Sequence, residues 1–391
     1  MQKDFHYYAA YCAAFLAGYS HSESLAIAYS DQFTDCCSRT LLRKLSAPRS
    51  AATTQLQTEL MKEDTGVIGL QNITRIWSSF HFLPYDLYAS LPHRPRTYMN
   101  RYRLICKPNG ILVADTVRLA KGQSLQAAGL AMHILSDTWA HSFFAGTPSA
   151  VINNVSSYFY ELLEENGAET EREISFRHNP AVKDDAVNGL YTASVHNENE
   201  NSIMNLGHGR AGHLPDYSYA RYKYLPAWGD YEELVKDNPS DYYRAFCQMV
   251  YALKFLRGEV DAFTVDTYDE EAVAPWSEEI SAIIKKRQLI ACEDWKALGE
   301  KLSGESIEDF DIEKYQEEYA CAPEESKDDT FLGKYFIAAM AQKSMVTNRI
   351  FRSGNFLAGF SVEYRLKGFR GIGDFRKLIR HSGGERRNER R

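Results

Sequence analysis

The sequence predicts an all-α protein: a multi-helix bundle with a metal cleft and an acidic insertion. Three observations support this prediction. Apolar residues recur at helical spacing through most of the chain, His and Asp residues share one face of the most apolar segment, and residues 258–330 carry 22 Asp and Glu against 7 Lys and Arg. With 391 residues, 44% of them hydrophobic, the chain has room for two or three average domains or for one large helical domain with insertions.

The first 50 residues predict two helices. Residues 5–19 are largely apolar and aromatic, and a second apolar pattern runs from about residue 22 to residue 45. Asp31 and Asp35 lie four residues apart in the second helix. We expect Asp31 to be an ordinary solvated carboxylate, and Asp35, beside two cysteines, to turn inward.

Residues 50–65 are polar and predict either a loop or a surface helix. His81 follows in an aromatic stretch, and Pro84 favours an extended backbone before it, so His81 is expected on a buried loop or turn. It is either a site residue or a core histidine bonded to the backbone. Residues 94–110 are basic and form either a solvated face or a rim that faces phosphate, and residues 111–121 form a helix or a short strand.

Residues 128–148 form the segment around which the chain is organised. They place His133, Asp137 and His141 at positions i, i+4 and i+8, which drift by only about 40° per step around a helix. A polar stripe on an otherwise apolar helix needs partners, because unpaired buried charge is costly. The stripe is therefore either part of a metal site or two core histidines hydrogen-bonded to Asp137.

Further helices are expected after this segment, at residues 150–166, 180–195, 217–224, 239–257 and 331–351. The Gly-rich run before residue 217 brings His208, His213 and Asp216 together, and glycines allow the backbone to bend sharply there. We expect His213 and Asp216 to be a second ligand pair, with His208 in reserve.

The charge pattern divides the chain. Residues 258–330 have a net charge of −15 in a chain whose total is −7. The predicted division is a metal-binding helical core at 1–257, an acidic insertion of helices and loops at 258–330, a C-terminal segment at 331–380 whose helix returns to the core, and a disordered tail at 381–391.

Composition excludes several classes of protein. A net charge of −7 argues against binding duplex nucleic acid by charge alone, although bound cations would still allow a phosphate ligand. Seven scattered cysteines favour a cytoplasmic protein with reduced thiols over a disulfide framework. We expect no signal peptide and no transmembrane segment. The sequence contains no Walker loop, no G-x-S-x-G motif and no H-E-x-x-H motif.

The candidate site combines five histidines with two or three carboxylates, enough to hold two or three metal ions with positions left for water or substrate. Zn fits these ligands, and Mn, Fe and Ni stay open. Such ions activate water and bind a phosphoryl group, which is the usual basis of phosphoester hydrolysis. The candidates are His6, Asp35, His81, His133, Asp137, His141, His213 and Asp216.

The order of these residues resembles the zinc-dependent phospholipase C and fungal single-strand nuclease superfamily, an all-helical fold with a trinuclear zinc cleft. Five stretches are more closely similar to an uncharacterised bacterial family that carries only a domain-of-unknown-function label. They are MQKDFHYYAAYCAAFLAG, IAYSDQFTDC, FHFLP, HILSDTWAHSFFAG and GHGRAGHLPD. Together they span roughly the first 225 residues.

The resemblance implies a role for each candidate. Asp137 would bridge two metals, one of them also held by His81 and His133 and the other by His6. In that superfamily a mature N-terminal Trp supplies its amine to a metal, and here Asp4 is the candidate for that place.

The remaining candidates complete the set. His141, His213 and Asp216 would hold the third ion, and Asp35 would orient or deprotonate the attacking water.

Three hypotheses follow from the sequence. The first is a metal-dependent hydrolase of a small-molecule or lipid phosphoester, such as a phospholipid headgroup, a nucleotide or a small phosphodiester. The second is a non-catalytic helical protein, stabilised by metal, that serves as a binding or scaffold protein. The third is a scaffold without metal. The oligomeric state stays open.

Overall fold

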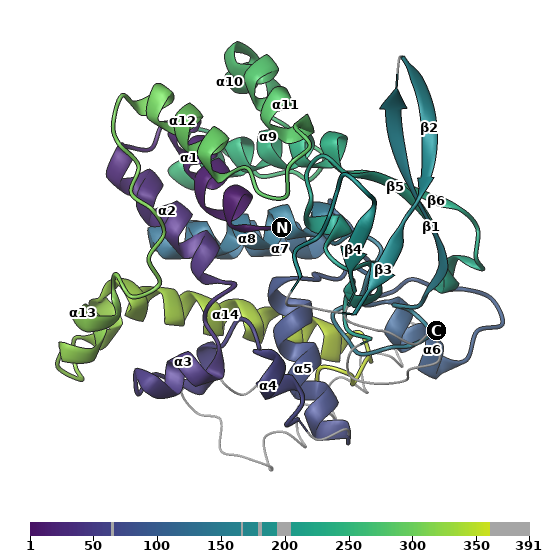
Figure 1. Ribbon diagram of the computed structural model, residues 1–391. Helices are drawn as coiled ribbons and strands as arrows, with labels where there is room; N and C mark the ends of the chain where they lie inside the picture. Colours follow the sequence, from purple (N-terminus) through teal and green to yellow (C-terminus); the bar gives the residue numbers. More distant parts are fainter. Residues whose placement is uncertain (64–65, 166, 179–181, 194–204, 360–391) are drawn as a thin grey trace.

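A computed structural model describes residues 1–63, 66–165, 167–178, 182–193 and 205–359 of the protein (Figure 1). The fold is mixed α/β, and the all-α prediction is therefore wrong: a four-stranded antiparallel sheet and a two-stranded sheet accompany the helices. None of the helices in the described part of the chain combines the length and the apolar character needed to cross a membrane.

The helical part surrounds α8 (Leu125–Ala140), which lies at its centre in Figure 1. Ser124 begins α8 by accepting a hydrogen bond from the Ala127 amide. Almost every residue of α8 is buried, as expected of a helix that is apolar on all sides. The helix predicted within 128–148 is thus present, but it ends at Ala140.

The other α-helices are α1 (Ala10–Leu16), α2 (His21–Phe33), α3 (Arg39–Lys44), α4 (Gln57–Leu60), α5 (Val67–Phe80), α6 (Arg96–Tyr102), α7 (Ile111–Ala120), α9 (Asn238–Arg257), α10 (Glu270–Val273), α11 (Ser277–Lys285), α12 (Cys292–Ser303), α13 (Gln316–Cys321) and α14 (Phe331–Arg352). The chain opens with a π-helical segment, η1 (Asp4–Ala9). The described residues also form six 3₁₀ turns: η2 (Arg49–Ala51), η3 (Gly209–Ala211), η4 (Leu214–Asp216), η5 (Ala227–Gly229), η6 (Ala274–Trp276) and η7 (Lys327–Asp329).

The long helix predicted from residue 22 to residue 45 is two helices. α2 begins with a capping box between Ser20 and Glu23, and Ser38 starts α3 by accepting from the Leu41 amide. The short connection between them follows Thr34, whose hydroxyl donates to a carbonyl of its own helix.

α2 and α8 pack closely because α8 has a glycine where they meet. A Cβ atom on Gly129 would lie 2.2 Å from the Ile27 carbonyl oxygen and 2.7 Å from Ser30 Cβ. Only glycine therefore permits this separation of the two helices. The close packing brings the buried Asp31 of α2 next to His133, one turn further along α8.

Within the described residues, strands of the two sheets stand where three helices were predicted, at 150–166, 180–195 and 217–224. The strand order of the four-stranded sheet is β2-β1-β5-β6, and a parallel pair β3-β4 lies beside it. The strands are β1 (Val155–Glu165), β2 (Ala168–Glu173), β3 (Ser175–Arg177), β4 (Leu190–Thr192), β5 (Arg221–Pro226) and β6 (Leu234–Asp237).

Aromatic alternation explains the sheet. Tyr222 and Tyr224 are two residues apart on β5, so their rings share one face of the sheet, where both stack on Phe159 of β1. These rings are buried in a second, smaller hydrophobic core. The helix predicted at 217–224 was therefore wrong for Tyr222 and Tyr224, which lie on a strand.

The acidic segment 258–330 contains helices whose apolar residues face the core, while its charged residues are on the surface. Ile280, Ile284, Trp295 and Leu298 are buried and join the main core. α14 then returns the chain to α8 and agrees with the predicted helix at 331–351. Residues 360–380 of the predicted C-terminal segment and the predicted disordered tail at 381–391 lie outside the described residues.

Candidate metal centre

The structure brings the ligand-type residues of five separate stretches to the C-terminal half of α8. η1 supplies His6, and α2 leads to Asp35, two residues after its end. His81 directly follows α5, and η4 carries Asp216. α8 itself supplies His133 and Asp137, and ends at His141.

Asp137 is the centre of this cluster. Its Oδ1 atom lies 2.8 Å from the amino group of Met1 and 3.2 Å from His6 Nε2. Its Oδ2 atom lies 3.2 Å from His81 Nδ1 and 3.2 Å from His133 Nε2. Each carboxylate oxygen therefore faces its own pair of nitrogen donors, an arrangement in which one carboxylate can bridge two cations.

A further group lies beside Asp137. His141 Nε2 is 3.1 Å from Asp216 Oδ1, and His208 Nε2 is 3.8 Å from Asp216 Oδ2. These three residues can direct one donor atom each at a common point. The side chain of His213 is 60% exposed and contacts Asp216 Oδ2 from the rim, at 3.0 Å. The reserve candidate His208 is thus inside the group, and the preferred candidate His213 is at its edge.

Asp35 faces the same cluster from α2. Its Oδ1 atom is 3.8 Å from both His81 Nδ1 and His133 Nε2, and its side chain is 33% exposed. Gln32 donates to the other carboxylate oxygen at 3.4 Å. Asp35 therefore has one side toward the buried nitrogens and one toward solvent.

Backbone carbonyls fix the orientation of three histidines. His81 Nε2 contacts the Thr53 carbonyl oxygen at 3.0 Å, His141 Nδ1 that of His81 at 2.8 Å, and His208 Nδ1 that of Gly212 at 2.7 Å. A carbonyl only accepts, so the nitrogen facing it carries the proton. The other nitrogen of each ring is left with a lone pair directed into the cluster, as in metal-ligating histidines.

Asp31, which was expected to be solvated, faces the other two histidines, His6 and His133. Asp31 is fully buried, and its Oδ1 atom lies 2.7 Å from His6 Nδ1 and 3.2 Å from His133 Nδ1. It lies four residues after the buried Ile27, on the same face of α2, which packs against α8.

The residues fit divalent metal ions. His6 is fully buried, yet neither of its ring nitrogens has a hydrogen-bond partner of suitable geometry, and Asp31 Oδ2 has none either. Buried polar atoms without partners are rare in proteins. Asp137 and Asp216, also buried, add negative charge that cations would compensate. Imidazole and carboxylate groups are the donors that Zn and similar ions take.

The carboxylates control the protonation of the cluster. Burial opposes the charged form of His133, but the attraction of Asp137 and Asp35 outweighs it and raises the pKa of His133 to about 10. In the same way Asp137 and Asp216 overcome burial and raise the pKa of the Met1 amine to about 11. For His208 burial prevails and lowers the pKa to about 4. Some donors are thus neutral at pH 7, and others hold a proton that a cation would displace.

A pocket of about 480 Å³ opens onto the cluster. Asp35, His81 and His141 line it, together with residues that include Trp77 and Phe82. Among the residues that the structure describes, no Lys or Arg lines this pocket. An anionic ligand would therefore find positive charge only at bound cations and protonated groups of the cluster.

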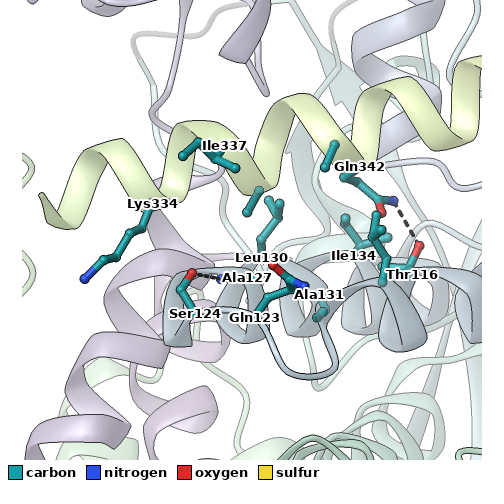
Figure 2. A pocket seen from close by; sticks show the side chains of 14 residues that line it. Thr116, Gln123, Ser124, Ala127, Leu130, Ala131, Ile134, Lys334, Ile337 and Gln342 are labelled. Atoms are coloured by element: carbon teal, nitrogen blue, oxygen red, sulfur yellow. Dashed lines mark hydrogen bonds between the residues drawn. The ribbon is translucent and has the colours of Figure 1, made fainter. Parts of the chain in front are cut away.

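A second cavity, of about 130 Å³, lies between α7, α8 and α14. In Figure 2, Leu130 and Ile134 of α8 lie opposite Ile337 of α14 across it. Gln342 donates to Thr116 Oγ1 at 2.9 Å and ties α14 to α7 (Figure 2). Its described lining contains no His, Cys, Asp or Glu, so this cavity lacks the side chains that usually bind metal ions.

Met1 and Asp4 differ from the expectation for the N-terminal segment. Asp4 accepts hydrogen bonds from the amides of Phe5 and Ala291, and it is not one of the residues around Asp137. The place suggested for it next to the metals is taken by the amino group of Met1, which is also 3.3 Å from Asp216 Oδ1. A main-chain amine has no side-chain signature, and sequence patterns do not reveal it.

Fold and site together define a mixed α/β protein with a buried cluster of histidines and carboxylates suited to divalent cations. The chain belongs to a family of unknown function, DUF6765, which matches residues 1–350. No curated protein and no solved structure was found to match it.

Proposed function

We propose that the protein is a metal-dependent hydrolase of phosphoesters that uses metal-activated water. The observation that carries the proposal is the convergence of histidines and carboxylates around the buried Asp137, several of which, including Asp35, His81 and His141, line an open pocket. A purely structural metal site is closed by protein ligands, whereas a catalytic site keeps a position accessible to water and substrate. The sequence resemblance to the zinc-dependent phospholipase C and nuclease superfamily adds to this proposal.

Three ligand groups are proposed, with Zn as the first choice of metal. His81 and His133 would share one ion with Asp137, and Asp35 is near enough to complete that group. His6 and the Met1 amine would hold another on Oδ1 of Asp137.

The third ligand group consists of His141, His208 and Asp216. His213, which the sequence analysis preferred, is 60% exposed at the rim and would orient Asp216 through its contact with Oδ2.

When bound, such ions supply Lewis acidity and lower the pKa of a water molecule. The chain's own residues provide the rest. Asp35 faces both the buried nitrogens and the pocket, so its carboxylate can accept the proton of an attacking water. Trp77 donates from Nε1 to Gln55 Oε1 at 3.2 Å, which fixes an aromatic wall next to His81. This wall can hold the organic part of a substrate.

The substrate class and the location of the protein are part of the same proposal. A pocket without described basic residues favours a substrate with one phosphoester group over a polyphosphate. A phospholipid headgroup, a nucleotide or a small phosphodiester meets this requirement. A cytoplasmic location accords with the seven cysteines, which are free thiols.

Metal analysis and a phosphoester panel test the proposal. Purified protein should contain two or three divalent ions per chain and hydrolyse at least one member of the panel. Asp137→Asn should lower the metal content, and it should lower the turnover rate by more than 100-fold, because one carboxylate serves two ions. Asp115→Asn, a matched change on the neighbouring helix α7, should alter neither.

The outcomes separate the hypotheses. Protein that binds metal stoichiometrically but hydrolyses nothing in the panel is the metal-stabilised binding or scaffold protein. Protein that takes up no divalent metal refutes the proposed function.

A further inference from the structure

The five histidines of the cluster are held in two different ways. His81, His141 and His208 each face a backbone carbonyl with one ring nitrogen. His6 and His133 face a single side chain, Asp31. A carbonyl is fixed by the fold, whereas a carboxylate also carries charge, so the second pair is oriented by a group that can be changed without altering the backbone.

Asp31 contacts both rings through the same oxygen. Its Oδ1 atom is 2.7 Å from His6 Nδ1 and 3.2 Å from His133 Nδ1. The two imidazoles are stacked with their centroids 3.9 Å apart and their planes 23° from parallel. Both rings then direct Nε2 to Asp137, but to different oxygens of it.

Asp31 is held in place by the packing of α2 against α8. It is fully buried, and Gly129 of α8 lies one turn before His133, where a Cβ atom would come within 3.0 Å of the Asp31 amide nitrogen. The lining of the pocket does not include Asp31. A substrate or solvent molecule in the pocket therefore does not meet it.

We propose that Asp31 is a positioning residue shared by two of the three ligand groups. Its negative charge next to both rings favours the tautomer with the proton on Nδ1 of His6 and of His133, so that both histidines offer Nε2 to a cation on either side of Asp137. The inference rests on the proposed function. It adds that one carboxylate behind the cluster sets the affinity of two positions, while the third position, built from His141, His208 and Asp216, is independent of it.

Carboxylates behind ligating histidines have a known magnitude of effect. Their removal costs about 10–100-fold in metal affinity, because they fix the tautomer and raise the basicity of the ring. For Asp31→Asn we expect this loss in two of the stepwise Zn affinities and none in the third. Asn is close in shape to Asp but a weaker acceptor, so the substitution tests the charge rather than the packing.

A Zn titration of the metal-depleted protein, with a chromophoric competitor, tests the inference. The matched control is Asp4→Asn, which changes another buried carboxylate that accepts from two backbone amides. The control should retain all affinities of the wild type. Equal affinities in Asp31→Asn and the wild type would overturn the inference while the proposed function stands, and absence of Zn binding in the wild type would overturn both.

A measurement on the wild type covers the case in which Asp31→Asn does not fold. Imidazole ¹⁵N spectra of the Zn-loaded protein report which nitrogen of each ring binds metal. Nε2 should be bound in His6 and His133, with Nδ1 protonated, and Nδ1 should be bound in His81. Binding through Nδ1 of His6 or His133 would instead make Asp31 a direct ligand and would overturn the inference.

Discussion

His208 and His213 are two single residues that can be compared directly as candidate metal ligands. His208 directs Nε2 at the group with His141 and Asp216, while His213 reaches Asp216 from the exposed rim. We expect His208→Ala to weaken one Zn affinity by at least 10-fold and His213→Ala to leave the Zn stoichiometry unchanged. Stepwise Zn titration of the two variants decides the question, and the reverse result would restore His213 as the ligand.

The pH dependence of metal binding follows from His133. Its pKa is raised to about 10, because the attraction of Asp137 and Asp35 exceeds the opposing effect of burial. At pH 7 the ring is therefore protonated, and a cation must displace that proton. Zn affinity should rise between pH 6 and pH 8 by about tenfold per unit for each proton displaced. Calorimetry in buffers of different ionisation enthalpy counts these protons, and a flat profile would contradict the assignment.

Gly129 provides a prediction at the scale of helices. The Cβ atom of Gly129→Ala would meet the Ile27 carbonyl oxygen and force α2 away from α8. Overpacking of this kind costs about 1–3 kcal/mol of unfolding free energy, and the displaced α2 also carries Asp31 and leads to Asp35. Thermal denaturation and Zn titration should both detect the change.

A suitable control for this variant is Gly229→Ala. The nearest atom that its Cβ would meet is Pro226 Cγ, at 3.4 Å, an ordinary contact distance. The control should be within about 0.5 kcal/mol of the wild type, as most surface substitutions are. Equal stability of the two variants would mean that α2 and α8 separate without cost.

Glu161 joins the sheet to the helices. It is fully buried on β1, and it accepts from Arg287, at 2.6 Å, and from Arg172. Breaking a buried pair costs about 3–5 kcal/mol, which the partial exposure of both arginines reduces to about 2–3. Chemical denaturation of Glu161→Gln should show this loss. Glu169→Gln, in the exposed pair with Arg221, should lose less than about 1 kcal/mol.

The sequence predicts those elements whose pattern is local. The stripe of His133, Asp137 and His141 needs one helix, and α8 and α14 were found for that reason. The strands were missed because β1 mixes aromatic residues with a Glu- and Leu-rich half that favours helix, and pairing with β5 decides the outcome.

The candidate site likewise has some members that the sequence indicates and others that it does not. Residue type and order indicated most of its members, including Asp137 and Asp216. Asp31 was misread because its burial depends on a glycine about 100 residues away, and the Met1 amine because it carries no side-chain pattern. Local residue spacing does not predict contacts between segments that are far apart in the sequence.

At the scale of the whole molecule, metal should act as a cross-link between segments that are far apart in the sequence. The cluster ties residues 1–9, α2, α5, α8 and residues 205–216 together. Chelation should lower the melting temperature and increase amide hydrogen exchange in residues 1–9 and 205–216. α11 (Ser277–Lys285) supplies no ligand and should change little. A uniform increase over the whole chain would contradict this localised role.

The distance between His6 and Asp216 in the sequence has a consequence for synthesis. His6 leaves the ribosome about 200 residues before Asp216 does, an interval of about 10–40 s at about 5–20 residues per second. The early donors are accessible to any cation throughout that time, whereas in the finished fold His6, His133 and Asp137 are buried and do not line the pocket. On the proposed function, the metal in the mature protein would therefore depend on which free ions are abundant where the nascent chain folds, as well as on the intrinsic order of affinities.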